Sequence, residues 1–343
     1  MQYRGRHPIF DPTAIAAYPL RTRTNKVALG DLLDPAEALR RPTRLAAETV
    51  TRVEAVAEAV VAARAAGRPV VLFTGAHLIK NGLGPLLADL VRRGRVTLVA
   101  GNGATAIHDF ELALIGATSE HVPNALGQGQ FGMAYEFAYL NVALQIGNRQ
   151  GLGYGESLGR MIGDAEFRAA VLAAAARAGS PREFAHPEIS VLAACHQTRV
   201  PFTVHVGIGT DVSDQHPSFD GEAKGGCSGR DFLIYVNELA KLTEGGVVIN
   251  VGSAVTGPEV LLKAVSMAAN TGRAPRGIVT ADFDLRPYRP DQMDDEAAPG
   301  YYYRDQKSVA TRIPQAFAGR GFYVEGDEQE TFVLLCQKVC GPR

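Results

Sequence analysis

Short, continuously apolar runs alternate along the chain with longer segments in which apolar residues recur every three or four positions. Runs of the first kind are typical of strands that are buried on both faces, and the periodic segments predict helices. The predicted strands are 70–74, 96–100, 142–146, 202–206, 247–251, 278–281 and 321–324. The predicted helices are 43–67, 82–93, 109–115, 164–178, 187–198, 229–243 and 258–270, with one more on each side of 321–324.

This alternation predicts an α/β fold: a Rossmann-like, doubly wound parallel sheet with helices on both faces. Residues 1–42 mix prolines, arginines and short apolar pieces, and they predict an N-terminal helical arm that is mostly irregular. Residues 43–343 predict a single α/β domain. Within it, the polar and proline-rich stretch 284–306 predicts a long loop, and such loops in compact domains are often functional.

Composition narrows the choice of partners. The 343 residues are 46% hydrophobic with a net charge of −1, and no block of five like charges occurs. We therefore expect a small-molecule substrate, with no nucleic acid and no membrane as partner. The first ten residues lack the apolar stretch of a signal peptide, and no run of 18 apolar residues predicts a membrane span. The four cysteines form no disulfide framework, which favours a cytoplasmic location.

Glycines and polar residues follow the predicted strands again and again. These strand-end groups are TGAH (74–77), GNG (101–103), GN (147–148), GIGTD (207–211), GSA (252–254) and Asp282. In an open parallel sheet, ligands bind outside the carboxyl ends of the strands, where glycine lets a backbone approach closely and helix N-termini bind phosphate. No G-x-G-x-x-G motif and no P-loop are present. The groups predict a nucleotide-type crevice, with ordinary tight turns as the alternative.

Several polar residues at these ends have two interpretations each. Asp109 is expected to begin a helix after the glycine turn, where it serves as a cap, and His108 has no such explanation. Asp211 either contacts a ribose or nicotinamide group or caps a helix. Asp214 and His216 have the D-x-H spacing of two metal ligands, or of a carboxylate that orients a histidine base; the alternative is a polar loop.

The order of these pieces resembles that of the deoxyhypusine synthase family. The stretches that carry the resemblance are TGAHLIKNGL (74–83), VTLVAGNG (96–103) with His108-Asp109, IGN (146–148), GYGE (153–156), VPFT (200–203), GTD (209–211), GVVINVGSAV (246–255) and TAD (280–282). The resemblance implies NAD in a Rossmann-like crevice, a homotetramer with sites at a dimer interface, and transfer of an aminobutyl group from spermidine through an imine to a lysine. The cofactor-binding residues it implies are Thr74, His77, Gly101, Asn102, Gly103, Asp109, Asp211, Gly252, Ser253 and Asp282.

Departures from the family pattern are equally informative. The family's catalytic lysine follows a Trp-Gly pair, whereas this chain has no tryptophan and places Lys307 in the sequence Gln-Lys-Ser. Glu259, in Gly-Pro-Glu, stands where the family has paired histidines, and the family's nucleotide segment is replaced by LRPYRP (285–290). The chain therefore looks like a divergent paralogue and not an authentic deoxyhypusine synthase. The catalytic candidates are Lys307, His216, Asp214 and Glu259, and no metal site is expected.

Three functions remain open. The leading hypothesis is an NAD-dependent transferase or oxidoreductase that acts on an amine or polyamine through an imine, with Lys307 carrying or accepting the fragment. An imine-forming lysine must be neutral and therefore desolvated, for which the tyrosines 301–303 could form an apolar wall; the alternative is a solvated surface lysine. The second hypothesis is a metal- or thiol-dependent lyase or hydrolase that uses Asp214, His216 and Cys227. The third is a nucleotide-binding module without catalysis.

Overall fold

A six-stranded sheet runs through the computed structural model, which describes residues 4–243 and 245–341. Every neighbouring pair of its strands is parallel. From one edge to the other the strands are β5 (Phe202–His205), β3 (Leu98–Asn102), β2 (Val70–Thr74), β6 (Val247–Val251), β7 (Val279–Asp284) and β8 (Arg320–Glu325). Numbered along the chain, this is the order 3-2-1-4-5-6 of a Rossmann fold, whose switch point lies between β2 and β6.

Both faces of the sheet are covered by helices, which confirms the predicted Rossmann-like α/β class. One face of β2 buries Val70 and Leu72, and the other buries Val71 and Phe73. This alternation explains why the strand is apolar without a break, because each face needs its own packing residues. The first face is covered by α2 (Ala47–Ala65), α4 (Gly84–Arg92) and α14 (Glu328–Cys340), and the second by α11 (Gly221–Leu239), α12 (Thr256–Asn270), α13 (Ile313–Ala316) and a π-helical segment, Gln306–Arg312.

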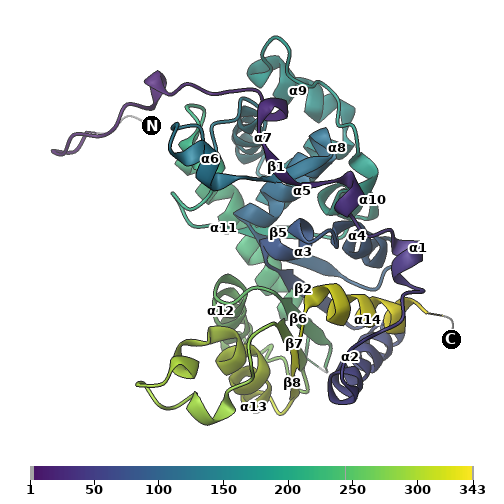
Figure 1. Ribbon diagram of the computed structural model, residues 1–343. Helices are drawn as coiled ribbons and strands as arrows, with labels where there is room; N and C mark the ends of the chain where they lie inside the picture. Colours follow the sequence, from purple (N-terminus) through teal and green to yellow (C-terminus); the bar gives the residue numbers. More distant parts are fainter. Residues whose placement is uncertain (1–3, 244, 342–343) are drawn as a thin grey trace.

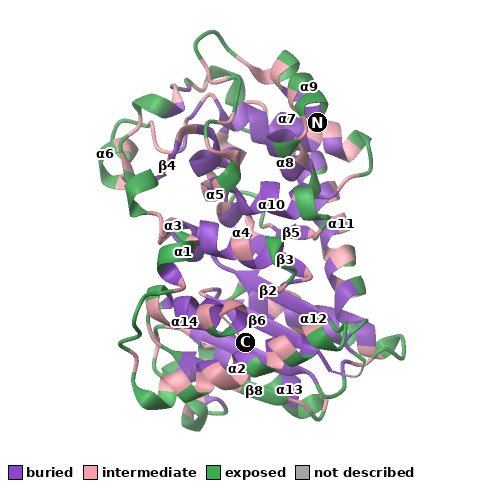
Figure 2. Cartoon of the chain, turned by 90° about the vertical axis from the view of Figure 1, so that its right-hand side faces the viewer, coloured by how far each residue is buried: buried purple, intermediate pink, exposed green. Residues whose placement is uncertain are grey.

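A helical lobe, defined here as residues 103–199, stands on the β5 side of the sheet. Its helices are α5 (Gly103–Ile115), α6 (Val122–Leu126), α7 (Phe137–Arg149), α8 (Tyr154–Gly163), α9 (Ala165–Ala175) and α10 (Val191–Thr198). Figure 2 shows that buried residues continue from the sheet into α5, α7, α8 and α10. The lobe therefore shares one hydrophobic core with the sheet.

The remaining elements are short. The strand β1 (Asn25–Ala28) pairs with β4 (Ala117–Glu120) in a small antiparallel sheet, which attaches residues of the predicted arm to the helical lobe. Two short helices are α1 (Pro35–Ala38) and α3 (Ala76–Lys80). Single 3-10 turns lie at Pro12–Ala14, Leu20–Thr22, Leu29–Asp31, Pro187–Ile189, Val212–Gln215, Pro290–Gln292 and Pro299–Tyr302.

One predicted strand is wrong. Residues 142–146 lie in the middle of α7, a helix in which nearly every side chain from Phe137 to Leu144 is buried. A helix buried all round loses the periodic alternation that distinguishes it from a buried strand, so a short apolar run is ambiguous. The predicted glycine turn at 147–148 is accordingly the last turn of a helix.

Two helices begin earlier than the sequence predicted. The helix expected at 109–115 is α5, which starts at Gly103 because the Asn102 side chain accepts a hydrogen bond from Thr105 N at 2.9 Å. The helix expected at 229–243 is α11, which starts at Gly221 behind the cap Asp220. Glycines at both starts hid these first turns, because glycine is a poor helix former.

Candidate active site

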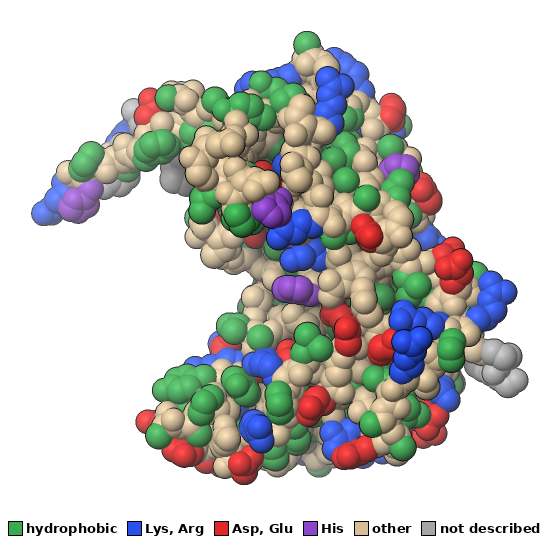
Figure 3. Space-filling view, in the orientation of Figure 1, with side chains coloured by type: hydrophobic (Ala, Val, Ile, Leu, Met, Phe, Trp, Pro, Cys, Tyr) green, Lys and Arg blue, Asp and Glu red, His purple; other side chains and the backbone are tan. Residues whose placement is uncertain are grey.

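A hollow separates the helical lobe from the lower part of the molecule in the space-filling view (Figure 3). In the same orientation, the ribbon shows α3 and α12 beside this hollow, and these helices follow the carboxyl ends of β2 and β6 (Figure 1). The hollow therefore lies at the edge of the sheet where ligands of open α/β proteins bind. We call this edge, with the residues that follow the strands, the crevice.

At the switch point the two central strands end almost in contact. The backbone N–H of Gly75 donates to Val251 O at 2.9 Å, and a β-carbon at position 75 would collide with the carbonyl of Gly252. Gly252 itself has a φ of +60°, a conformation that glycine adopts without strain. The glycines at this point are thus required by the meeting of two turns.

Glu328, the first residue of α14, reaches the switch point from the other end of the chain. One carboxylate oxygen accepts a hydrogen bond from Asn81 Nδ2 at 2.8 Å, and the other lies beside Gly252. The side chain is 8% exposed, and burial raises the pKa of the Glu328 carboxyl to about 7. A carboxyl that titrates near neutral pH, with one oxygen free, is suited to accept or donate a proton there.

His77 stands near the same point, in α3. Its side chain is exposed to solvent on one side. Partial desolvation of the ring, followed by the charges of Lys80 and His108, lowers the pKa of His77. Thr74 and Ser253, two other predicted cofactor-binding residues near the switch point, are in contact with the protein itself. Thr74 is fully buried, and the Ser253 hydroxyl accepts a hydrogen bond from Gly257 N at 2.9 Å near the start of α12.

On the β5 flank, a buried lysine joins two aspartates. Lys224 Nζ lies 2.7 Å from Asp211 Oδ2 and 2.6 Å from Asp214 Oδ1, and all three side chains are nearly inaccessible. Burial raises the pKa of the Asp211 carboxyl, and the Lys224 ammonium opposes that rise. The Asp211 carboxylate rests against Gly103, where any β-carbon would strike it. We call this group the β5 cluster.

His216 is separate from Asp214, although the sequence spacing could have paired them. Its Nδ1 accepts a hydrogen bond from Ser218 N at 3.1 Å and lies 2.7 Å from Ser218 Oγ. Its Nε2 is buried without a hydrogen-bond partner. Burial and Arg177 lower the pKa of the His216 ring to about 4, so the imidazole is neutral at physiological pH. Neither the D-x-H metal pair nor the carboxylate-oriented base is formed.

On the β7 flank, aspartates outnumber their cation. Asp282 and Asp305 are completely buried and each keeps one oxygen without a hydrogen-bond partner. The other Asp282 oxygen accepts from Asn250 Nδ2 at 2.7 Å, while Arg286 pairs with Asp305 and with Asp284. Burial, and then the charge of Asp305, hold the pKa of Asp282 well above its ordinary value. We call this group the β7 cluster.

Lys307 lies in the π-helical segment beside β7, with a side chain that is 2% exposed. Its Nζ stands 3.3 Å from the centre of the Tyr301 ring and donates to Tyr301 O at 3.3 Å. Burial, with Arg312 and Arg304, lowers the pKa of the Lys307 ammonium. The aromatic wall expected from the tyrosines is thus provided by Tyr301, and π-helical turns are rare and often found at functional sites.

The four catalytic candidates are spread across the sheet. Glu259 lies on α12 and pairs with Lys263 and Arg304. Asp214 and His216 follow β5, and Lys307 packs beside β7, four strands away. At a strand spacing of about 4.8 Å, this separation is about 19 Å. Among the described residues, no hydrogen bond or ion pair joins any two of the four.

The stretch after β3 is occupied by structural contacts, which corrects several predicted roles. Asp109 is in the middle of α5 and caps α10 instead, accepting hydrogen bonds from Ser190 Oγ, Val191 N and Leu192 N. Asn102 caps α5, and Gly103 makes room for Asp211. Gly101 lies against the Thr105 side chain. Each of these positions therefore has a partner or a close neighbour within the protein, and their predicted contact with a cofactor stays a prediction.

The thiol alternative loses its nucleophile. Cys227 is fully buried inside α11, where its Sγ lies 3.5 Å from Leu144 O, and burial raises the pKa of its thiol. A reactive cysteine needs an accessible, readily ionised thiol. Within the described part of the chain, no three His, Cys, Asp or Glu side chains converge as metal ligands. In the same residues, no helix has both the length and the apolar character that a membrane crossing requires.

Sequence reasoning missed Glu328, Lys224, Asp305 and Arg286. Lys224 was hidden because it lies before the predicted helix 229–243, although Asp220 is a typical helix cap and the helix begins directly after it. Glu328 follows Asp327, another cap, at the start of the last helix. Its position at the switch point depends on how α14 crosses the sheet, and local sequence carries no signal for that.

Comparisons with known proteins return similarity in structure only. No protein-family model and no curated protein matches the chain. ArgZ, an arginine dihydrolase of the ornithine–ammonia cycle in cyanobacteria, is 16% identical over 84% of this chain, with a TM-score of 0.46. AgrE in complex with ornithine and NAD+ is 18% identical over 87% of this chain, with a TM-score of 0.45. The chain spans about a third of each of those two chains, 32% and 34%.

A putative deoxyhypusine synthase from Entamoeba histolytica is also similar. It is 10% identical over 94% of this chain and 96% of its own, with a TM-score of 0.39. These identities describe a likeness of fold, and the assignment of chemistry depends on the crevice itself.

Proposed function

We propose that this protein is an NAD-dependent enzyme that oxidises a primary or secondary amine to an imine in the crevice. The observation that carries the proposal is Glu328, a carboxyl with a pKa near 7 and one unpartnered oxygen at the switch point of a Rossmann-ordered sheet. One oxygen accepts a hydrogen bond from Asn81, and the second accepts none from the described residues and is therefore available to a substrate.

Residues at the switch point fit a dinucleotide. Of the long helices that follow β3, β5 and β6, α5 and α11 are capped by Asn102 and Asp220, whereas Val255 before α12 gives no side-chain cap. In the first turn of α12, next to Gly252, the Ser253 hydroxyl satisfies Gly257 N, and the other N–H groups of that turn would hold the pyrophosphate. NAD+, if bound there, would supply the acceptor for the hydride that leaves the carbon carrying the amine. His77 is the exposed side chain available to contact the bound molecules from the β2 side.

An amine substrate suits the charges around the crevice. Carboxylates lie at the switch point and on both flanks, and two of the nearby cations, Lys224 and Arg286, are already paired with aspartates. A cationic amine is attracted to such a rim. Ionised Glu328 would take the proton that the amine nitrogen must lose before its carbon can give up a hydride. The rate should therefore rise with pH and reach a plateau above about pH 7.

The proposal is tested with Glu328→Gln and with Glu330→Gln, a matched control two residues further along α14 that pairs with Arg41. NAD+ should raise the unfolding midpoint of all three proteins, because a ligand of the folded state stabilises it. NADH formation is then followed with spermidine, 1,4-diaminobutane and L-ornithine. We expect a loss of about 100-fold or more in kcat for Glu328→Gln alone. No midpoint shift at millimolar NAD+, or full activity of Glu328→Gln, would refute the proposal.

Lys307 completes the proposal: its neutral amine would add to the imine carbon and displace the substrate nitrogen as a free amine, so that Lys307 carries the fragment as a new imine. Three features of Lys307 support this role: its buried side chain, the lowered pKa of its ammonium and the contact of its Nζ with the Tyr301 ring. Borohydride reduction in the presence of NAD+ and an amine substrate should leave a stable adduct on the wild-type protein. The same adduct on Lys307→Arg would show that another residue forms the imine.

A further inference from the structure

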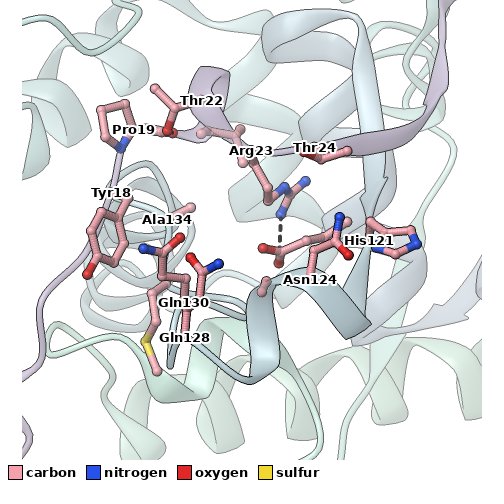
Figure 4. A pocket seen from close by; sticks show the side chains of 14 residues that line it. Tyr18, Pro19, Thr22, Arg23, Thr24, His121, Asn124, Gln128, Gln130 and Ala134 are labelled. Atoms are coloured by element: carbon pink, nitrogen blue, oxygen red, sulfur yellow. Dashed lines mark hydrogen bonds and ion pairs between the residues drawn. The ribbon is translucent and has the colours of Figure 1, made fainter.

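A second cavity, of about 370 Å³, lies in the helical lobe and away from the crevice (Figure 4). One wall is the segment 18–24, and the other is the end of β4 with α6 and the loop to Ala134. The segment is fixed at both ends. Tyr18 N donates to Met133 O at 2.7 Å at one end, and β1 pairs with β4 at the other. The cavity is therefore enclosed by a strap held by backbone hydrogen bonds.

An arginine and a carboxylate face each other inside. Arg23 Nη2 pairs with Glu111 at 2.7 Å and Arg23 Nε donates to Asn25 Oδ1, which leaves Nη1 pointing toward Glu120 at 3.8 Å. One Glu120 oxygen accepts from Gly132 N at 2.9 Å. The gap between Arg23 and Glu120 exceeds hydrogen-bond length, so both groups retain capacity for a ligand.

Neutral polar groups line the space around this pair. Figure 4 shows Gln128 and Gln130 on one side of Arg23, with Asn124 and His121 on the other. Among the described residues, none of the three amide side chains has a hydrogen-bond partner, and the Nδ1 atom of His121 is buried and unpartnered. Asn124 and Gln128 are exposed and therefore open to a ligand, and the buried, unpartnered His121 Nδ1 requires a hydrogen-bond partner that a polar ligand would supply.

We infer that this cavity binds a small α-amino acid. The carboxylate of the ligand would contact Arg23, and its ammonium would contact Glu120. An α-amino acid carries these two opposite charges a short, fixed distance apart, as the cavity does. The amides of Asn124, Gln128 and Gln130 would contact a polar side chain. Phosphorylated ligands fit poorly, because Glu111 and Glu120 together outweigh the charge of Arg23. The volume lies within the range of small-molecule sites.

The loop that forms the cavity also packs toward the crevice. A β-carbon at Gly132 would strike Val212 and Gln215, which belong to the turn between Asp211 and His216. The amino-acid site and the β5 cluster therefore share this wall. The inference stands on the cavity alone and does not require the proposed redox chemistry.

The experiment screens the twenty standard L-amino acids by thermal shift on the full chain and measures the best by calorimetry. For L-glutamine, the matched analogues are glutaramate, which lacks the ammonium, and 4-aminobutanamide, which lacks the carboxylate. Each analogue should bind at least tenfold more weakly than the intact amino acid. The inference would be overturned if both analogues bound as tightly as the intact amino acid, or if no amino acid bound.

Variants locate the site. Gln128→Leu and Asn124→Leu remove exposed, unpartnered amides, so the fold should not change. Each should weaken binding by about fivefold, the effect of one hydrogen bond. Gln150→Leu, an exposed control at the end of α7, and Glu328→Gln in the crevice should bind as the wild type does. If Glu328→Gln abolishes binding and Gln128→Leu does not, the amino acid occupies the crevice and the inference is wrong.

Discussion

The β5 and β7 flanks of the crevice both bury aspartates, but among the described residues only the β5 flank has a buried cation paired with them. In the β5 cluster, the Lys224 ammonium contacts Asp211 and both oxygens of Asp214. In the β7 cluster, Arg286 is partly exposed and pairs with Asp284 and Asp305, whereas Asp282 forms no ion pair among the described residues. The first cluster compensates its charge with an ammonium, whereas in the second burial and the charge of Asp305 raise the pKa of the Asp282 carboxyl.

This difference indicates a structural role for the β5 cluster and a capacity for proton transfer in the β7 cluster. A lysine whose protons are shared among two carboxylates fixes the turn after β5 and is a poor nucleophile. Two buried carboxyls with raised pKa values, beside a single arginine, can exchange protons with a substrate or with each other. Three predictions test whether the two flanks really differ in this way, and they are ordered by expected effect.

The largest effect is expected for Lys224→Met. The change leaves Asp211 and Asp214 buried without their cation, which should lower the free energy of unfolding by about 3–5 kcal/mol in urea titrations near pH 8. The loss should shrink near pH 5, because the stranded carboxylates can then bind protons in the folded state. Lys241→Met, which removes an exposed partner of Glu238, should cost under about 1 kcal/mol. Equal losses in both variants would show that the β5 cluster is not held by its lysine.

A smaller effect is expected for Arg286→Met. Its guanidinium bonds to Asp284 and Asp305 and lies 4.6 Å from the centre of the Tyr303 ring, but 29% of the side chain is exposed. Solvent therefore screens part of the interaction, and the expected loss is about 1–2 kcal/mol in the same urea titrations. Arg160→Met, at an i,i+4 helical pair with Glu156, should change the unfolding free energy by about 0.5 kcal/mol or less. A loss as large as that of Lys224→Met would make the two flanks equivalent.

The sequence predicted the sheet far better than the clusters beside it. β2 and β6 were located to the residue, because short runs of Val, Ile and Leu between glycines have few other interpretations. The strand at 142–146 was wrong because α7 is buried on all sides. Predicted helix starts failed at Gly103 and Gly221, where a cap outweighs the low helix propensity of glycine.

The site depended on contacts that sequence spacing does not encode. Asp214 and His216 are two residues apart in the chain and yet bond to different partners, Lys224 and Ser218. Glu328 and Gly252 are 76 positions apart and meet because α14 crosses the sheet. Strand-end glycines correctly indicated the edge of the sheet, but the partner of each glycine became known only from the fold.

The smallest effect, and the sharpest test of the comparison, is expected for Asp282→Asn. Asp282 binds its proton more tightly in the folded protein than in the unfolded chain, because burial and Asp305 raise its pKa. Its contribution to stability is therefore greatest below the ordinary aspartate pKa of about 4 and is lost as the pH rises toward the raised value. Asparagine cannot titrate, so the decline in unfolding free energy between pH 4 and pH 8 should become shallower. Exposed Asp291→Asn serves as the control. An unchanged slope in Asp282→Asn would mean that Asp282 is ionised in the folded protein, and the β7 flank would then need a cation that Arg286 does not supply.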